Sequence, residues 1–201
     1  MLIGEGKIVS PKLRIAFTGS SCSGKTENCN YLINKYKFRH TYINQTRWLI
    51  EKKYDGELEL ARKENVKFQN LLLKRKIYWE NQHQRSGFVT DRTTLDNAAY
   101  YLSFSGNESI EAVTNYLTKA ITHAKKAYDL IIFLSPILNA PEDPLSPRDP
   151  LYQLKIHYII LGLLTVVEKE NPNLVKYVYI QDREQRQVIM DNFIQEKLQE
   201  I

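Results

Sequence analysis

Short apolar runs alternate with longer segments of helical periodicity along most of the chain. Runs of four to seven residues rich in Ile, Leu, Val, Phe and Tyr predict buried strands. Five such runs occur, at residues 13–17, 38–43, 87–90, 128–134 and 177–180. The clearest is the run at 128–134, which reads YDLIIFL and is followed by Ser135-Pro136.

Helical spacing of apolar positions fills the intervals between these runs. Helices are predicted after a glycine-rich turn at 19–26, from 47 to about 84, at 94–104, 109–127 and 151–170, and from 184 to the end. Because strands alternate with helices, the sequence predicts an α/β fold with a five-stranded parallel sheet and helices on both faces. No repeat, low-complexity tract or Gly/Ser linker divides the chain, so we expect a single domain over residues 1–201.

One late segment departs from both patterns. Four prolines stand there among charged residues: Pro141, Pro144, Pro147 and Pro150. Proline fixes φ and lacks the backbone N–H, so this stretch is unsuited to the interior of a helix or a sheet. The sequence therefore predicts an exposed, mobile excursion over residues 139–150.

The glycine-rich turn reads GSSCSGKT and matches the phosphate-binding pattern G-x-x-x-x-G-K-[ST] at every fixed position. It lies between a predicted strand and a predicted helix, so that backbone N–H groups and the helix N-terminus face a nucleotide's phosphates. Lys25 would reach the β- and γ-phosphates, and the Thr26 hydroxyl would ligate Mg²⁺. The predicted ATP-binding residues of this P-loop are Gly19, Ser20, Ser21, Cys22, Ser23, Gly24, Lys25 and Thr26.

Two common classes of P-loop protein lose support from the rest of the chain. A signalling GTPase needs an N/T-K-x-D motif after a later strand, but the Asn-Lys pair at 34–35 lies in the first predicted helix. A motor or AAA-type ATPase usually ends a hydrophobic strand with Asp-Glu. The strand at 128–134 is instead followed by Ser135-Pro136, which offers no carboxylate for Mg²⁺.

From about Leu13 to Phe193 the chain resembles the P-loop nucleoside and nucleotide kinases. It resembles in particular the thymidylate-kinase-like and nicotinamide-riboside-kinase-like branch, which has an AAA-type ATP-binding domain. Besides the P-loop, the resemblance rests on Thr46-Arg47, Phe68-Gln69, Asp91–Asp96 and Ala99-Tyr100. It implies an ATP-dependent phosphotransferase with Mg²⁺ as cofactor and ATP as phosphoryl donor.

The resemblance also implies roles for single residues. Asp91 would lie near Mg²⁺ or the acceptor oxygen, and Arg92 would bind the acceptor phosphate or the transferred phosphoryl group. Arg47, Gln69 and Asp96 would contribute to acceptor binding, with Gln69 on a base edge. The alternative readings are a strand-end ion pair for Asp91-Arg92 and solvated helix positions for Arg47 and Gln69.

Two further arginines acquire roles through the same resemblance. The resemblance implies that the proline-rich segment is a mobile lid over about residues 139–155. Its Arg148 would close over ATP and stabilise charge in the transition state. Arg186, or Arg183 beside it, would stack on adenine after the last strand; a solvated helix start is the alternative.

The acceptor is narrowed by one chemical argument. A neutral 5′-hydroxyl must lose a proton during attack, so nucleoside kinases place a carboxylate beside it, usually just after the second strand. Here Asn44–Arg47 follows that strand, and the next carboxylate is Glu51. This favours a (deoxy)nucleoside monophosphate held by Arg47 and Arg92. A nucleoside or nicotinamide-riboside kinase with Asp91 as base stays open.

Composition and charge leave two other classes open. The chain has 43% hydrophobic and 25% charged residues, which excludes wholesale disorder, and its net charge of +5 indicates anionic partners. A kinase acting on a nucleic-acid end or on a modified base in DNA would suit that charge, yet Lys and Arg are dispersed. A non-catalytic nucleotide-binding regulator is the last alternative, and it would need neither the Asp-Arg pair nor a lid.

The expected compartment is the cytoplasm. Two cysteines form no disulfide framework, the first residues lack the features of a signal peptide, and the apolar stretch 158–167 is too short to cross a bilayer. We therefore expect ATP and a small nucleotide or nucleoside as partners, with nucleic acid as second choice and no membrane; a homodimer is left open.

Overall fold

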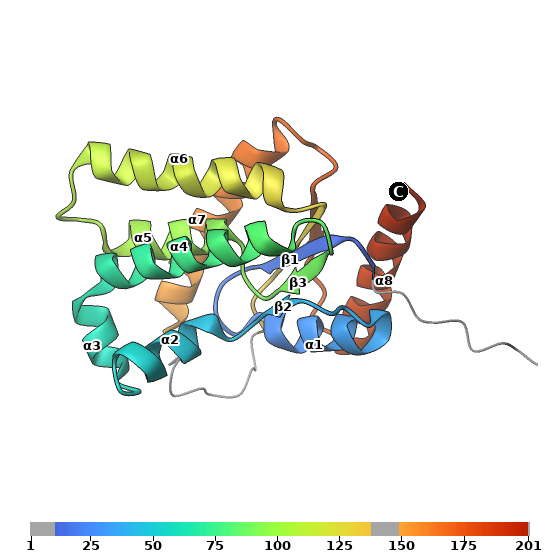
Figure 1. Ribbon diagram of the computed structural model, residues 1–201, viewed down its shortest axis with the longest axis horizontal. Coiled ribbons are helices and arrows are strands. Elements are labelled where there is room, and N and C mark those ends of the chain that lie inside the picture. The colour runs from blue at the N-terminus through green and yellow to red at the C-terminus, as the bar shows by residue number, and fades with distance from the viewer. Residues whose placement is uncertain (1–10, 138–148, 201) are drawn as a thin grey trace, which may run out of the picture.

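A five-stranded, fully parallel sheet forms the centre of the molecule, as the alternation of strands and helices predicts. The computed structural model describes residues 11–137 and 149–200. The strand order is β2-β3-β1-β4-β5 (Figure 1). The strands are β1 (Arg14–Thr18), β2 (Thr41–Tyr42), β3 (Phe88–Thr90), β4 (Leu130–Leu134) and β5 (Val175–Val178).

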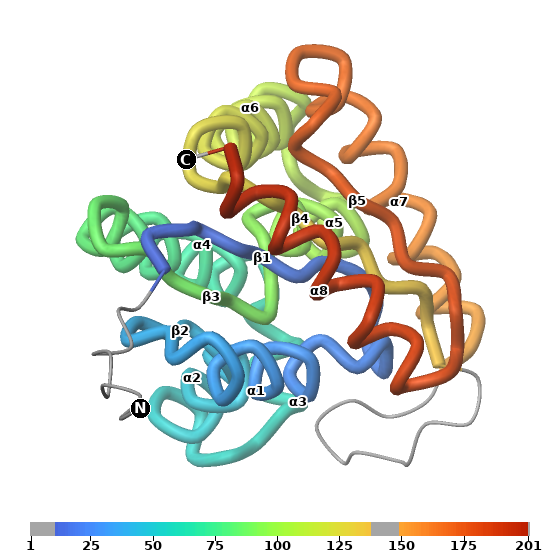
Figure 2. Tube along the Cα trace, turned by 90° about the vertical axis from the view of Figure 1, so that its right-hand side faces the viewer, coloured from blue at the N-terminus to red at the C-terminus, as the bar shows by residue number. Residues whose placement is uncertain are grey.

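Eight helices cover the sheet within the described residues. They are α1 (Lys25–Tyr36), α2 (Gln45–Lys53), α3 (Leu58–Lys63), α4 (Asn65–His83), α5 (Thr94–Phe104), α6 (Ile110–Ala127), α7 (Pro150–Glu168) and α8 (Arg183–Gln199). One core cluster joins α4, α5, α6 and α7 to the sheet, and a second joins α1 and α8 to its other face (Figures 1 and 2). Helices therefore lie on both faces, as predicted.

Strand β4 contributes side chains to the hydrophobic cores on both faces of the sheet. Ile131 and Phe133 belong to the core under α4–α7. Leu130, Ile132 and Leu134 belong to the core under α1 and α8. Successive side chains of a strand point to opposite faces, so a strand buried on both faces needs a continuous apolar run.

The helical segment from 47 to about 84 is divided into three helices rather than one. The first break follows α2, where Asp55 and Gly56 adopt φ of +50° and +83°. The second break lies at Glu64, between α3 and α4. The divided segment folds around a small apolar cluster: Leu49, Ile50, Tyr54, Ala61, Phe68 and Leu72.

The last strand is displaced from its predicted position at 177–180. Val178 pairs with Leu134, the last residue of β4. Beyond it the neighbouring chain continues as Ser135-Pro136, and proline has no N–H to extend the ladder. Tyr179 and Ile180 therefore lie past the end of the sheet and are exposed.

Helix α7 begins inside the segment predicted as a lid. Asp149 caps its N-terminus by accepting from the Tyr152 N–H, and Pro150 occupies the first turn, where a missing N–H costs nothing. Residues 150–155 are thus helical. Residues 139–148, including Arg148, lie outside the described residues, so the lid itself stays a prediction.

By length and composition α7 also qualifies as a membrane span, with a mean hydropathy of 1.4. In this fold Ile156, Ile160 and Leu164 of α7 pack into the core shared with α5. Core helices of water-soluble domains satisfy the same criteria, so α7 is weak evidence for a membrane.

Candidate phosphate-binding and acceptor site

Three chain segments meet at the carboxyl end of the sheet, where ligands of open parallel sheets bind. The P-loop follows β1, Asp91-Arg92 follows β3, and Asn44 follows β2. Because β2, β3 and β1 are consecutive neighbours in the sheet, these segments lie side by side. The strand order thus brings together residues that are far apart in the sequence.

The P-loop has the backbone geometry that its glycines predict. Gly19, Cys22 and Gly24 have φ of +144°, +57° and +80°. A Cβ on Gly19 would lie 2.4 Å from the Leu134 carbonyl oxygen, so only glycine fits there. Helix α1 starts at Lys25 directly after Gly24, which has no side chain to cap the first amides. The first turn of α1 therefore suits an anion.

Lys25 lies inside this loop and is only 7% exposed. Its Nζ donates to the Ser20 carbonyl oxygen at 2.6 Å and to Ser23 Oγ at 3.1 Å. Burial, reinforced by the positive charge of Arg92, lowers the pKa of Lys25 to about 8. The loop thus holds a cation at reduced solvation, where an anionic phosphate would stabilise the charged form.

This lowered pKa predicts that nucleotide affinity falls as pH rises. Phosphates favour charged Lys25 and raise its pKa, so affinity decreases between the pKa of the free protein and that of the complex. We expect the Kd of a non-hydrolysable ATP analogue to rise roughly tenfold or more between pH 8 and pH 9.5. Equilibrium titrations measure this, with Lys25→Arg, which stays charged, as control. A flat wild-type profile would contradict it.

Asp91 joins the P-loop to β2. Its Oδ2 accepts from Thr26 Oγ1 at 2.8 Å and from the Asn44 N–H at 3.1 Å, and the residue is 8% exposed. A hydroxyl oxygen next to a carboxylate is a donor set that suits Mg²⁺, with phosphate oxygens and waters completing the shell. The predicted metal residues, Thr26 and Asp91, therefore do lie together.

Arg92 extends the site on the other side of Asp91. Its guanidinium carbon lies 5.1 Å from the Tyr100 ring centroid, and Nη1 lies 3.9 Å from Asp96 Oδ1. That Nη1 is buried and has no hydrogen-bond partner among the described residues. Burial alone would lower the pKa of Arg92, but Tyr100, Asp96 and Asp91 together raise it. A guanidinium with an unused N–H donor suits the binding of an anionic acceptor substrate.

Asp96 has a different role from the predicted one. It is fully buried, and its Oδ2 accepts from Thr18 Oγ1 at 2.8 Å and from the Thr93 N–H at 2.7 Å. With Thr93 it forms the capping box that begins α5. Both carboxylate oxygens have partners within the protein, so in this structure Asp96 joins α5 to the end of β1 and offers no free oxygen to an acceptor.

Two buried amides lie on the adjoining helices α4 and α5. Gln69 and Asn97 are each 5% exposed, and their side-chain oxygens lack a hydrogen-bond partner among the described residues. A buried unpaired oxygen is costly, so each calls for a polar partner. Gln69 was predicted from the sequence, whereas Asn97 was not. The sequence feature that could have indicated Asn97 is its position in the predicted helix at 94–104, one turn before Tyr100.

Arg47 is the most exposed of the predicted acceptor residues. It lies in the first turn of α2, whose N-cap residue Asn44 donates its N–H to Asp91. Its neighbour Trp48 stacks under Arg75 of α4, with the guanidinium carbon 4.1 Å from the ring centroid. The N-cap of α2 thus adjoins Asp91, whereas the part of Arg47 in acceptor binding stays a prediction.

Arg186 corrects a second prediction. It is 1% exposed, and its Nη1 and Nη2 donate to the carbonyl oxygens of Ser23 and Ser135 at 2.8 and 3.0 Å. Nε donates to the Ile180 carbonyl oxygen, and burial lowers the pKa of the guanidinium. A side chain so enclosed offers no face to an adenine ring. Arg186 instead fastens the P-loop to the ends of β4 and β5.

Arg183, the other arginine considered for adenine, stays at the surface. Its Nε lies 2.6 Å from Glu27 Oε1 at the start of α1. A cavity of about 540 Å³ opens beside this ion pair, between α1 and α8. The geometry therefore leaves Arg183, rather than Arg186, accessible at this edge of the P-loop.

The family model described as an AAA domain matches residues 14–186, from the first strand to Arg186 itself. The chain belongs to this AAA domain family. No curated protein matches the sequence of this AAA domain protein.

Solved structures show where the fold of this AAA domain protein recurs. Deoxyadenosine kinase from M. mycoides, solved with dCMP and dCDP as products, has a TM-score of 0.61 at 14% identity. That alignment covers 94% of this chain and all of the other. Thymidylate kinase from Ehrlichia chaffeensis has a TM-score of 0.53 at 14% identity, covering 91% and 98% of the two chains. The fold is that of the P-loop nucleotide kinases.

Proposed function

We propose that this AAA domain protein is an ATP-dependent kinase that transfers the γ-phosphoryl group to a small nucleotide, most directly a (deoxy)nucleoside monophosphate. One observation carries the proposal: Arg92, whose buried Nη1 has no hydrogen-bond partner among the described residues, directly follows Asp91, which is hydrogen-bonded to Thr26 of the P-loop. A donor site and a cationic acceptor clamp are thus adjacent. The similarity in fold to deoxyadenosine and thymidylate kinases is consistent with this chemistry.

The proposed reaction uses the two cations differently. Lys25 and the amides of the P-loop hold the β- and γ-phosphates of ATP. Arg92 binds the acceptor phosphate, an oxygen of which forms the new bond to the γ-phosphorus as the bond to the β-phosphate oxygen breaks. Because that acceptor oxygen is already anionic, no general base is needed. ADP and a nucleoside diphosphate are the products.

Mg²⁺ would be held by Thr26 and Asp91. When bound, it would neutralise charge on the β- and γ-phosphates. Arg148 and the lid, which lie outside the described residues, are proposed to close over ATP. The side-chain oxygens of Gln69 and Asn97 are proposed to accept hydrogen bonds from the base of the acceptor.

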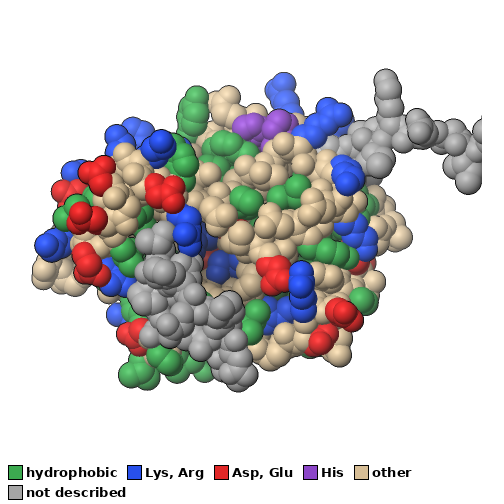
Figure 3. All heavy atoms as spheres, turned by 90° about the horizontal axis from the view of Figure 1, so that it is seen from below, with side chains coloured by type: hydrophobic (Ala, Val, Ile, Leu, Met, Phe, Trp, Pro, Cys, Tyr) green, Lys and Arg blue, Asp and Glu red, His purple; other side chains and the backbone are tan. Residues whose placement is uncertain are grey.

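A cytoplasmic location is proposed from the cysteines. Cys22 and Cys29 are both free, and Cys29 is buried in the core under α1. The nucleic-acid alternative gains no support from the face shown in Figure 3. There, Lys and Arg side chains are scattered among acidic and neutral ones and do not form one basic track.

Asp91→Asn tests the assignment of a monophosphate acceptor. If Asp91 acts on Mg²⁺, the variant should lose about 100-fold in kcat with a nucleoside monophosphate and regain part of it at high Mg²⁺. The dependence of kcat on pH should be the same in both proteins. Steady-state kinetics against Mg²⁺ concentration and pH measure this.

The nucleoside alternative predicts another outcome for the same variant. With Asp91 as a general base, activity toward a nucleoside would disappear at every Mg²⁺ concentration. The wild-type kcat would also rise with pH along an acid limb. Unchanged kinetics in Asp91→Asn would contradict both assignments.

A further inference from the structure

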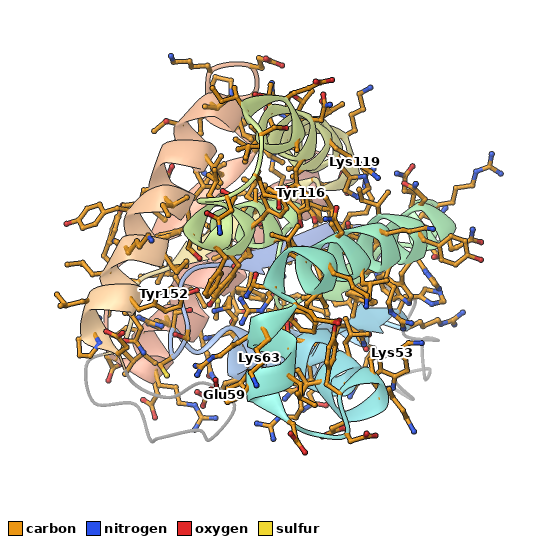
Figure 4. All side chains as sticks on the ribbon, turned by 90° about the vertical axis from the view of Figure 1, so that its left-hand side faces the viewer. Lys53, Glu59, Lys63, Tyr116, Lys119 and Tyr152 are labelled. Atoms are coloured by element: carbon orange, nitrogen blue, oxygen red, sulfur yellow. The ribbon has the colours of Figure 1, made fainter. Side chains whose placement is uncertain are left out.

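A second cavity, of about 430 Å³, lies between α4 and α6. The residues that line it come from the last turns of α4, from Gln84 just after that helix, and from α6 between Asn115 and Lys126. Those helices lead into the starts of β3 and β4, so the cavity lies toward the amino end of the sheet. The P-loop occupies the opposite, carboxyl end. The two sites are therefore separate (Figure 4, in which Lys119 is labelled on α6).

The lining of this cavity combines a mainly apolar accessible surface with several hydrogen-bond donors. Lys119, Thr122, His123 and Lys126 recur along one side of α6 at helical spacing, and Asn81 faces them from α4. None of the side chains that line the cavity within the described chain is a carboxylate. Its volume is within the range of small-molecule sites. This chemistry fits a small phosphate monoester whose hydroxyl groups meet the amides and threonines.

One wall residue, His123, belongs to a buried polar network. Its Nε2 lies 2.7 Å from Glu80 Oε2, and Glu80 is fully buried. Glu80 Oε1 lies 2.9 Å from Lys76 Nζ and also accepts from the Tyr128 hydroxyl. A buried ion pair of this kind costs desolvation energy, and replacement by apolar residues is often neutral or better. The proposed phosphoryl transfer makes no use of it.

The network ends at the active-site strand. Lys76 Nζ donates to Thr90 Oγ1 at 2.8 Å, and Thr90 Oγ1 donates to the Tyr42 carbonyl oxygen at 2.8 Å. Thr90 directly precedes Asp91 in the chain. A continuous series of two hydrogen bonds and one ion pair therefore connects the cavity wall at His123 to Thr90, at the start of the segment that bears Asp91 and Arg92.

We propose that the cavity between α4 and α6 binds a small phosphate monoester carrying sugar hydroxyls, and that His123, Glu80 and Lys76 transmit its binding to the Asp91 segment. The shared chemistry is that of sugar phosphates and nucleoside monophosphates. Binding of the phosphate monoester does not depend on the proposed kinase function. The effect of that binding on turnover does depend on it.

Ribose 5-phosphate is the probe for binding. Amide chemical shifts are followed in protein whose P-loop is filled with a non-hydrolysable ATP analogue, so that shifts near Arg92 report binding at the proposed acceptor site and shifts on α4 and α6 report binding at this cavity. We expect shifts on α4 and α6 with ribose 5-phosphate and with AMP, but none with ribose. Inorganic phosphate should bind at least about tenfold more weakly than ribose 5-phosphate. Shifts confined to other elements, or equal affinity for inorganic phosphate, would overturn the assignment.

Substitutions on α6 locate the phosphate contacts. The double variant Lys119→Gln/Lys126→Gln should raise the Kd for ribose 5-phosphate at least about tenfold. Lys125→Gln is the matched control, because Lys125 lies on the same helix but pairs with Glu170 at 2.5 Å. Its Kd should stay within about twofold of wild type. Equal affinities in the double variant and the control would refute the site.

Transmission is tested by kinetics with the acceptor. Saturating ribose 5-phosphate should change the acceptor KM at least about twofold in wild type. Lys76→Met, which does not line the cavity, should keep the chemical shifts and lose the change in KM; Lys76→Gln serves if the first variant unfolds. An unaltered KM in wild type would overturn the transmission. Absence of any kinase activity would refute the proposed function, and the shift measurement would still decide the binding site.

Discussion

Lys25→Ala is expected to lower kcat for phosphoryl transfer about 10³-fold while leaving the protein folded. Lys25 lies inside the P-loop, on the Ser20 carbonyl oxygen and Ser23 Oγ, where its charge faces the phosphates. Positioned cations of this kind stabilise the charge of the transferring group, and removing one preorganised group typically costs 10²–10³ in kcat.

The same variant should not be greatly destabilised. The lowered pKa of Lys25, about 8, shows that burial already disfavours its charge. Single-turnover transfer from ATP and thermal unfolding together measure the two effects. Lys35→Ala is the control, since Lys35 is on the same helix and pairs with Asp191 near the surface; its kcat should stay within about twofold of wild type. Near-wild-type turnover in Lys25→Ala would exclude the P-loop chemistry.

Arg186→Met is expected to destabilise the protein and to weaken ATP binding together. The substitution leaves the buried carbonyl oxygens of Ser23 and Ser135, and the partly buried one of Ile180, without their donor. A few buried, unpaired acceptors should cost about 2–4 kcal/mol in the free energy of unfolding. The Kd for ATP should rise about tenfold, because the P-loop loses its connection to β4 and β5.

Arg183→Met is the matched control for this effect. Arg183 is three residues away on α8 but exposed, and it forms a surface ion pair with Glu27. Its loss should cost less than about 1 kcal/mol. Denaturant unfolding and nucleotide titration of both variants measure the difference, with Arg186→Lys expected to restore part of each. Equal stability of the two methionine variants would show that Arg186 is not a structural clamp.

Features set by neighbouring residues were predictable from the sequence. The P-loop lies within eight consecutive residues, and helix α5 has the predicted bounds, Thr94–Phe104, because Thr93 and Asp96 form its capping box locally. The parallel sheet followed from alternation alone. Local signals sufficed wherever the partners are close in the sequence.

Roles that depend on burial were predicted wrongly. Arg186 and Asp96 are polar residues next to family-like motifs, so the sequence favours contact with ligands. Two of the three carbonyl oxygens that enclose Arg186 are 163 and 51 residues away, and Asp96 accepts from Thr18, 78 residues away. Asn97 was missed for the same reason, since only the packing of α4 on α5 shows its amide to be buried.

The most direct measurement of the central claim is the mass of the product formed from ATP and Mg²⁺ with each member of an acceptor panel. The panel holds deoxynucleosides, their 5′-monophosphates, nicotinamide riboside and DNA oligonucleotides. The proposal predicts ADP together with a nucleoside diphosphate, which appears only with the monophosphates and is lost in Lys25→Ala. Phosphate added only to DNA, or only to a nucleoside hydroxyl, would contradict the proposed acceptor class.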